Sequence, residues 1–259
     1  MPLDALELTR VAERLTLSGN KRRYYRFRGD RWYGGVATGD VVGCNLRCVF
    51  CWSRSRDPTA PGKLYSPEQV AQRIASIAER RRFRQARLSG GEPTIGWWSH
   101  TRHVAKLLVR DYRLHFILET NGVLIGLDER IAEDIADIAS EGSLEVRVSI
   151  KGATPETFER ITLVDRRYWE AQLEALENLV KAGLKPGDEV YPAIVMSFDR
   201  EEDIRQLIKR IAAIHPALAQ NIDPELVILY PHVRRRLEKI GIMPRKYFKP
   251  GEPLPEWMI

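Results

Sequence analysis

The sequence predicts an α/β protein built as a partial, TIM-like (β/α)6 barrel with parallel strands, an N-terminal helical extension and an irregular C-terminal tail. Short β-prone runs alternate with amphipathic helical patterns from about residue 36 onward, an order that gives a parallel sheet with right-handed crossovers. About six such units fit into the 259 residues, whereas a closed barrel needs eight. One predicted strand is polar along one face, which indicates a wet lumen inside the sheet.

The predicted strands are short and rich in β-branched residues, and a helical pattern follows each of the first five. They cover residues 36–42, 86–89, 115–120, 144–150, 190–196 and 226–229. The helix after the first strand has the clearest beginning, because Ser66 suits the N-cap, Pro67 the first turn and Gln69 a capping box. Asp199 is expected to cap the helix before the sixth strand.

The fourth strand, residues 144–150, separates polar from apolar side chains. Its apolar residues are Val146, Val148 and Ile150, and its polar residues are Glu145, Arg147, Ser149 and Lys151. Successive side chains of a strand point to opposite faces, so the apolar set should meet the helices and the polar set a lumen. In the third strand, His115, Glu119 and Asn121 share one face in the same way.

Three segments are expected along the chain: an N-terminal helix with a basic segment packed on the core (1–35), the barrel (36–240) and a C-terminal tail (241–259). In the N-terminal helix, Leu8, Val11 and Leu15 should face the core, because they recur at helical spacing. No apolar run approaches the ~18 residues of a membrane span, and the start of the sequence lacks a secretory pattern. We therefore expect a cytoplasmic protein without a membrane partner.

The chain is basic, with a formal net charge of +6 and a pI of about 9.3. Lysine and arginine gather at residues 21–23, 80–84 and 234–236. Such clusters suit nucleic acid or an acidic partner, but solvated helix faces carry similar runs of charge. The charge therefore leaves RNA binding open.

The three cysteines of the chain lie directly after the first strand. Cys44, Cys48 and Cys51 follow the spacing C-x3-C-x2-C, and an odd number in one short stretch favours a metal or redox role over disulfides. Thiolates are the ligands of iron–sulfur clusters, and three of them would leave one iron of a cubane open to a substrate or cofactor. A zinc site with a distant fourth ligand and an unused group of thiols are the alternatives.

At this motif the sequence resembles the radical SAM superfamily, since Phe50 precedes the last cysteine as in the family signature. A second resemblance follows the second strand, where Gly90, Gly91, Glu92 and Pro93 match the glycine-rich motif that meets the amino group of S-adenosyl-L-methionine (SAM). Alone, two glycines would indicate no more than a turn. Together, the two motifs make the resemblance specific from about residue 36 to 240.

Within that superfamily the sequence is most similar to pyruvate formate-lyase activating enzyme, of the branch that activates glycyl-radical enzymes. The resemblance implies that three further segments approach SAM, with cofactor-binding positions at Glu119, Asn121, Ser149, Lys151 and His232. Two departures from the branch stand out. Position 149 is serine where the branch has aspartate, and the order of Tyr230 and Pro231 is exchanged.

The resemblance implies a [4Fe-4S] cluster on Cys44, Cys48 and Cys51, with SAM as the second cofactor. The reduced cluster would cleave SAM to a 5′-deoxyadenosyl radical that abstracts hydrogen from a substrate, so no further catalytic residue is expected. An external one-electron donor of ferredoxin or flavodoxin type would supply the electron. The substrate stays open between a glycyl-radical partner, another protein or peptide, and a small molecule.

Two other functions remain in view. Radical modification of RNA or nucleosides, as in tRNA-modifying enzymes, would suit the basic segments and Tyr24, Tyr25 and Trp32. An iron–sulfur electron carrier or sensor would have no use for a methionine-binding loop, so residues 90–93 weigh against it. With three cysteines in all, a second cluster with four thiolate ligands cannot form.

Overall fold

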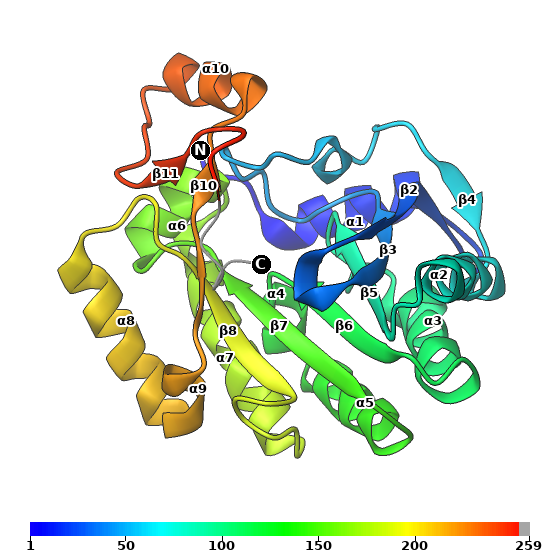
Figure 1. Cartoon of the computed structure of the whole chain (residues 1–259). Coiled ribbons are helices and arrows are strands. Elements are labelled where there is room, and N and C mark those ends of the chain that lie inside the picture. The colour runs from blue at the N-terminus through cyan, green and yellow to red at the C-terminus, as the bar shows by residue number, and fades with distance from the viewer. Residues whose placement is uncertain (254–259) are drawn as a thin grey trace.

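The computed structural model describes residues 1–253 and has a curved sheet with helices on its outer side (Figure 1). Six neighbouring strands run parallel, which confirms the partial barrel. They are β3 (Val36–Val41), β5 (Gln85–Gly90), β6 (His115–Thr120), β7 (Leu144–Ile150), β8 (Val190–Val195) and β9 (Asp223–Glu225). Among the described residues the sheet stays open, with β9 at one end of the order.

Three antiparallel strands extend the other end of this sheet. They are β1 (Leu17–Ser18), β2 (Lys21–Asp30) and β4 (Lys63–Tyr65), and β2 pairs with β1, β3 and β4. The sequence predicts a basic segment here and no strand. Two basic residues of β2 are ion-paired: the Nε atoms of Arg26 and Arg28 lie 2.5 and 2.9 Å from Oδ2 of the buried Asp40.

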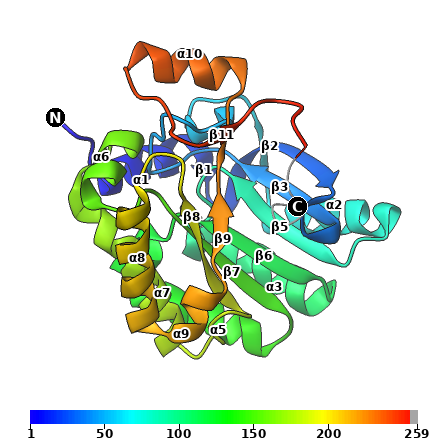
Figure 2. The same ribbon diagram turned by 60° about the vertical axis from the view of Figure 1, so that its left-hand side comes forward.

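The helices lie around the outer face of the sheet, and α10 lies at one end of the barrel (Figures 1 and 2). A separate two-stranded sheet, β10 (Val227–Ile228) with β11 (Tyr247–Phe248), lies beside α10 and gives the C-terminal tail its one strand within residues 241–253. The helices are α1 (Ala5–Thr16), α2 (Pro67–Arg81), α3 (Arg102–Lys106), α4 (Val123–Leu127), α5 (Glu129–Ser140), α6 (Pro155–Thr162), α7 (Trp169–Lys181), α8 (Glu201–Ile214), α9 (Pro216–Gln220) and α10 (Pro231–Lys239).

The apolar face of β7 is buried as its alternation predicts. Val146, Val148 and Ile150 are all fully buried and belong to the main hydrophobic core. The alternating polar residues instead bond across the lumen, as when Arg147 meets Asp223 and Glu225 of β9. The sheet therefore has an apolar outer face against the helices and a polar inner face.

The prediction for the sixth strand is wrong by several residues. The sixth parallel strand is Asp223–Glu225 rather than residues 226–229, and Val227–Ile228 pairs with Tyr247–Phe248 in the small sheet. The cause is that β9 uses Asp223 and Glu225 to bind Arg147 in the lumen. An apolar pattern cannot reveal a strand whose inner side chains are acidic.

The predicted inner face of the N-terminal helix is only partly confirmed, because Leu8 packs against the main core but Leu15 is exposed. The buried residues of α1 are Ala5, Thr9, Ala12 and Thr16, whereas Leu15 is 41% exposed and Leu8 and Val11 are only half-buried. Small residues face the core because α1 lies directly against the backbone of Gly43. A β-carbon at Gly43 would lie 3.2 Å from Cβ of Ala12, so larger side chains have no room there.

Helix starts are predicted well in one case and poorly in another. Ser66 and Gln69 form the expected capping box of α2, with Gln69 Oε1 accepting from the Ser66 N–H at 3.0 Å. The helix after β8 begins one residue later than expected, so Arg200 occupies the N-cap and no side chain caps it. Asp199 is instead buried, and burial raises its pKa.

Across the described residues, no helix is both long and apolar enough to span a bilayer. The division of the chain near residues 36 and 240 stays a prediction.

The packing of α1 can be tested by two substitutions. Ala12→Leu should destabilise the fold by about 1–3 kcal/mol, because the larger side chain is forced against Gly43. Leu15→Ala, at an exposed position, should change stability by no more than about 0.5 kcal/mol. Urea unfolding followed by circular dichroism measures both. A larger cost for Leu15→Ala would restore the leucine face that the sequence predicts.

Candidate active site at the carboxyl ends of the strands

The three cysteines lie on the loop that leaves β3, which we call the cysteine loop (residues 43–56). Hydrogen bonds hold this loop against the end of α6, with the N–H groups of Arg47 and Val49 donating to Thr162 and Ile161 at 3.0 and 2.8 Å. A small second core adds to the attachment. It contains Val49 and joins α6, the segment after β8 and α10, through Ile161, Val195, Phe198, Val227, Leu229, Val233 and Leu237.

Three guanidinium groups donate to carbonyl oxygens of the cysteine loop. Arg47 reaches the Cys44 oxygen at 2.6 Å and Arg56 the Cys48 oxygen at 3.4 Å. Arg236, from α10, donates to Val49 at 2.5 Å and also to the oxygen of Cys51. The loop therefore carries positive charge behind each cysteine, which would favour an anionic group on the thiolates.

Burial favours the protonated form of the Cys44 and Cys48 thiols when no metal is bound. Burial raises the pKa of Cys44 well above its usual value and that of Cys48 to about 12. Metal binding would therefore release protons. The Leu46 N–H lies 3.4 Å from the Cys44 sulfur and Asn121 Nδ2 lies 3.9 Å from it, which are donors of the kind that tune cluster sulfurs.

Within residues 1–253 no three His, Cys, Asp or Glu side chains converge as ligands of one metal ion. In a cluster, by contrast, each thiolate binds a different iron. The amide Nδ2 of Asn45, next to Cys44, is buried and unpartnered among the described residues. The three thiols, the N–H groups near the Cys44 sulfur and the unpartnered Asn45 amide therefore fit an iron–sulfur cluster better than a single metal ion.

The glycine-rich segment 90–93 is hydrogen bonded directly to the cysteine loop. The N–H of Gly91 donates to Val41 at 2.9 Å and that of Glu92 to Gly43 at 2.8 Å. A β-carbon at Gly91 would lie 2.2 Å from the Gly43 oxygen, so a side chain there would separate the two loops. The spacing predicts both motifs, and the structure brings them into contact.

Glu92 is a structural link inside this site. Its carboxylate accepts hydrogen bonds from Thr94 and Thr120, both at 2.7 Å, and from the Asn121 N–H at 2.8 Å. The side chain is 2% exposed. Glu92 therefore fixes the end of β6 to the end of β5, and its oxygens are occupied by the protein.

Arg22, one of the basic residues at 21–23, is fully buried beneath the glycine-rich segment. Its guanidinium donates to the oxygens of Glu92 and Pro93, each at 2.7 Å, and to that of Ile95. Burial lowers the pKa of Arg22. The Arg22 guanidinium thus binds the carbonyl groups of neighbouring residues and fixes the backbone conformation of the glycine-rich segment.

The lumen side of β6 carries Glu119 in a dense polar network. Its carboxylate accepts from Tyr33 and Ser89, both at 2.6 Å, and pairs with Arg87 at 3.1 Å. Burial opposes ionisation, but the nearby charges of Arg87 and Arg147 outweigh it and hold the pKa of Glu119 at about 2. Tyr33 reaches this position from a left-handed backbone conformation, with φ of 57°.

Ser149 and Lys151 meet Glu225 across the end of the lumen. Ser149 Oγ donates to Glu225 Oε2 at 2.7 Å, and Lys151 Nζ lies 3.2 Å from the same oxygen. Burial opposes the charge of Glu225, but Lys151 and Arg147 keep its pKa well below the usual range. Both sequence-predicted residues therefore lie in one ion-paired group at the ends of β7 and β9.

Gln172 is a buried residue of this region that the sequence analysis misses. From α7, its Nε2 donates to the carbonyl oxygens of Asn121 at 2.6 Å and Ser149 at 3.0 Å, and its Oε1 accepts from the Lys151 N–H at 3.1 Å. It joins the ends of β6 and β7. A polar residue amid the apolar stripe of Trp169, Leu173 and Leu176 is the signal that could have identified it.

His232 and the adjacent tryptophans Trp97 and Trp98 lie away from the lumen. His232 is exposed on α10, where its Nε2 is 3.0 Å from the oxygen of Trp52 and its ring stacks on Tyr230. Trp97 is buried and donates to Asp134 at 2.9 Å, while its neighbour Trp98 is 43% exposed. The two tryptophans point in different directions, as adjacent residues of a helical turn must.

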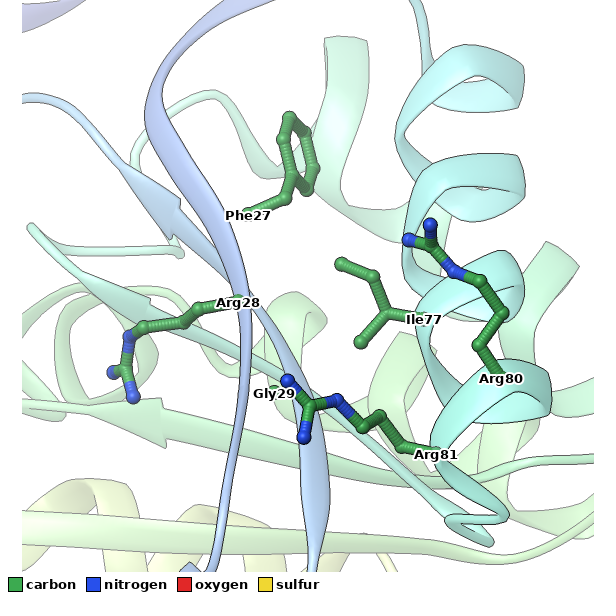
Figure 3. A pocket seen from close by; sticks show the side chains of 6 residues that line it. All are labelled: Phe27, Arg28, Gly29, Ile77, Arg80 and Arg81. Carbon is green, nitrogen blue, oxygen red and sulfur yellow. The ribbon is translucent and has the colours of Figure 1, made fainter.

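Two surface hollows lie outside the motif loops. One, of about 350 Å³, is lined by β2 and α2 (Figure 3), on the side where Gly29 pairs with Ala37 near the start of β3. Arg80 and Arg81 border it from α2, whereas the side chain of Arg28 points away. The other, of about 500 Å³, lies between α1 and α5 and includes Leu6, Trp98 and Leu127. None of the sequence-predicted cofactor or cluster residues lines either hollow.

Comparison with known proteins gives one family and several relatives. The model of the Radical SAM superfamily matches residues 40–211. A probable GTP 3′,8-cyclase of Thermococcus kodakarensis is 34% identical over 138 residues, which cover 53% of this chain and 41% of that protein. The GTP 3′,8-cyclase of Desulforamulus reducens is 30% identical over 141 residues, covering 52% and 40%. The chain thus spans about two fifths of these relatives' length.

Solved structures show the same fold at low sequence identity. The maturase HydG of the [FeFe]-hydrogenase matches with a TM-score of 0.52 and 12% identity, covering 95% of this chain and 61% of its own. SuiB of Streptococcus suis bound to S-adenosylmethionine matches with a TM-score of 0.51 and 16% identity, covering 66% and 36%. The curated relatives named above belong to another branch than the activating enzymes that the sequence suggests.

The buried cation at position 22 should be essential to stability. Arg22→Met removes the guanidinium that donates to three buried carbonyl groups, although the Pro93 oxygen keeps the Thr101 hydroxyl and the Glu92 oxygen keeps the Ile95 N–H as donors. Since a buried group that loses its partner costs about 1–3 kcal/mol, the loss of stability should reach at least about 2 kcal/mol. Lys21→Met, one residue away and exposed, should change stability by less than about 0.5 kcal/mol. Denaturant unfolding measures both. Equal stability of the two variants would contradict the role given to Arg22.

Folding should also depend on pH through His100, which follows the glycine-rich segment. Burial lowers its pKa to about 4, against about 6.5 when unfolded, and its Nε2 lies 3.0 Å from the Tyr24 hydroxyl. Arg22 and His103 disfavour the charged ring further, while Glu68 favours it. The stabilisation is complete above pH 6.5 and is lost as the pH falls towards 4.

Thermal unfolding between pH 7 and pH 4, compared with His100→Gln, tests this dependence. The wild-type protein should lose stability relative to the variant as the pH falls. Parallel curves for the two proteins would show that His100 does not titrate as its burial requires.

Proposed function

This chain belongs to the Radical SAM superfamily of iron–sulfur enzymes, which use a [4Fe-4S] cluster and SAM, and from that premise we propose how its residues divide the work. Cys44, Cys48 and Cys51 bind three irons of the cluster, and residues 90–93 hold the methionine part of SAM beside the fourth. The observation that carries this proposal is the backbone contact between the two loops, at Gly91 and Gly43.

The cluster and SAM, when bound, supply one-electron cleavage of SAM and a radical that abstracts hydrogen from the substrate. The contribution of the chain is positioning and exclusion of side reactions. Asn121 has its amide close to the Cys44 sulfur and 2.8 Å from Asn45 Oδ1, so it orients the side of the cluster that faces the lumen. Glu92 and Arg22 act one layer behind and keep the loop path fixed.

Glu119, Ser149 and Lys151 are proposed to line the cofactor side of the lumen. All three project from the ends of β6 and β7, where parallel α/β sheets bind their ligands. Their charges are already compensated by Arg87, Arg147 and Glu225. They therefore suit hydrogen bonds to a polar cofactor without adding net charge. His232 lies behind the cysteine loop, where it supports the backbone at Trp52.

For the substrate, we propose a purine nucleotide as the first candidate. The support is the likeness to proteins named GTP 3′,8-cyclase, at 34% and 30% identity over about half of this chain. The glycyl-radical partner and the RNA substrate that the sequence leaves open are the candidates to test next.

The cluster assignment predicts the effect of removing any one thiolate. Cys44→Ala, Cys48→Ala and Cys51→Ala should each lose the visible absorbance of the reconstituted cluster and essentially all reductive cleavage of SAM, because each thiolate binds a separate iron. Thr59→Ala, exposed further along the chain, should keep both. Iron analysis and chromatography of 5′-deoxyadenosine after anaerobic reconstitution give the readouts. Retained cleavage in any cysteine variant would overturn the assignment.

The substrate is tested by isotope transfer. GTP carrying deuterium at C3′ should pass its label into 5′-deoxyadenosine, since a bond formed at that carbon requires loss of its hydrogen. GTP labelled at C2′ serves as the control and should pass none. Cleavage of SAM without transfer from either nucleotide would remove GTP, and labelled RNA and peptide candidates would follow in the same assay.

A further inference from the structure

Electrons must reach the proposed cluster from a donor outside the protein. The cysteine loop reaches the surface at Trp52. Cys48 is buried and Cys51 half-buried, whereas the next residue, Trp52, is 46% exposed. One peptide bond therefore connects a proposed cluster ligand to an exposed indole. Helix α10 borders this point, because His232 contacts the Trp52 oxygen and Arg236 donates to that of Cys51.

Positive charge is concentrated around this point. We define the Trp52 face as residues 52–56 together with α10. These two segments contain six arginine and lysine residues against one glutamate. Their excess of five positive charges compares with a net charge of +6 for the whole chain. The surface next to the cysteines therefore carries a marked local excess of positive charge.

Several of these charges are available to a partner. Arg54, Arg235 and Lys239 are exposed and, within residues 1–253, have no carboxylate within ion-pair distance. By contrast, the lumen arginines Arg87 and Arg147 are ion-paired and almost buried. An anionic partner would thus meet unpaired cations on the Trp52 face and compensated ones in the lumen.

We propose that the Trp52 face is the docking site of a small acidic one-electron donor protein, an inference that rests on the proposed function. Opposite charges steer such partners and raise association rates, and exposed tryptophan and arginine are the residues that most often dominate binding. The face also offers the short route to the cluster, since Trp52 follows Cys51 directly. Docking here leaves the lumen free for substrate.

The test is the rate at which a reduced flavodoxin of net negative charge reduces the reconstituted enzyme. Stopped-flow absorbance of the cluster gives the second-order rate constant at low and high salt. Arg54→Glu combined with Arg235→Glu should lower that constant at least about tenfold at low salt, and the difference should shrink at high salt. Lys209→Glu, an exposed lysine on α8, makes the same kind of charge change away from the face and should leave it unchanged.

Dithionite supplies the internal control, because this small reductant needs no docking surface. It should reduce the double variant and the wild-type protein equally, which shows that the cluster is intact. A wild-type rate for the double variant with flavodoxin at low salt would overturn the proposal. If the double variant also lost binding to tRNA while flavodoxin reduced it at the wild-type rate, the face would instead be assigned to RNA. Failure of the proposed function would appear separately, as no SAM cleavage by the dithionite-reduced wild-type protein.

Discussion

A side chain at position 91 would collide with the carbonyl oxygen of Gly43, 2.2 Å from its β-carbon, and the arrangement of the site depends on this constraint. Because neither residue carries a β-carbon, the ends of β3 and β5 lie close enough for Glu92 to donate to Gly43. The Glu92 carboxylate extends the same contact to β6. The ends of β3, β5 and β6 are thereby joined by hydrogen bonds, and the buried Arg22 holds the glycine-rich segment through its carbonyl groups.

The lumen is polar but electrically balanced. Arg87 and Arg147 each bind two carboxylates, from β2 and β6 in one case and from β9 in the other. Buried ion pairs of this kind add little net stability, because desolvation offsets their attraction. Their use here is geometric: they hold the inner walls of an open barrel at fixed distances. Unpaired cations lie outside the lumen, for example on the Trp52 face.

The main strands and the polar face of residues 144–150 could be predicted from the sequence, whereas the particular charged partners that join the inner walls could not. The strands 115–120 and 144–150 have the predicted limits because β-branched residues mark them. Lys21–Asp30 and Asp223–Glu225 escaped because most of their residues are charged, which in a sequence is typical of solvated surface. Within the site, the cluster cysteines could be predicted from their spacing, and the glycine-rich segment from its motif after the second strand. The supporting roles of Arg22 and Gln172 depend on partners about 70 and 50 residues away, respectively.

The second hydrophobic core has a consequence for the lifetime of the protein in air. It is separate from the main core and attaches α10 and the cysteine loop to the barrel. Small units of this kind open locally at a lower free energy than the whole domain. Each such opening would admit oxygen to the thiolates while the barrel remains folded. Resistance to oxidative damage would then follow the packing of Val233 and Leu237 rather than the melting temperature, so the two properties could be engineered independently.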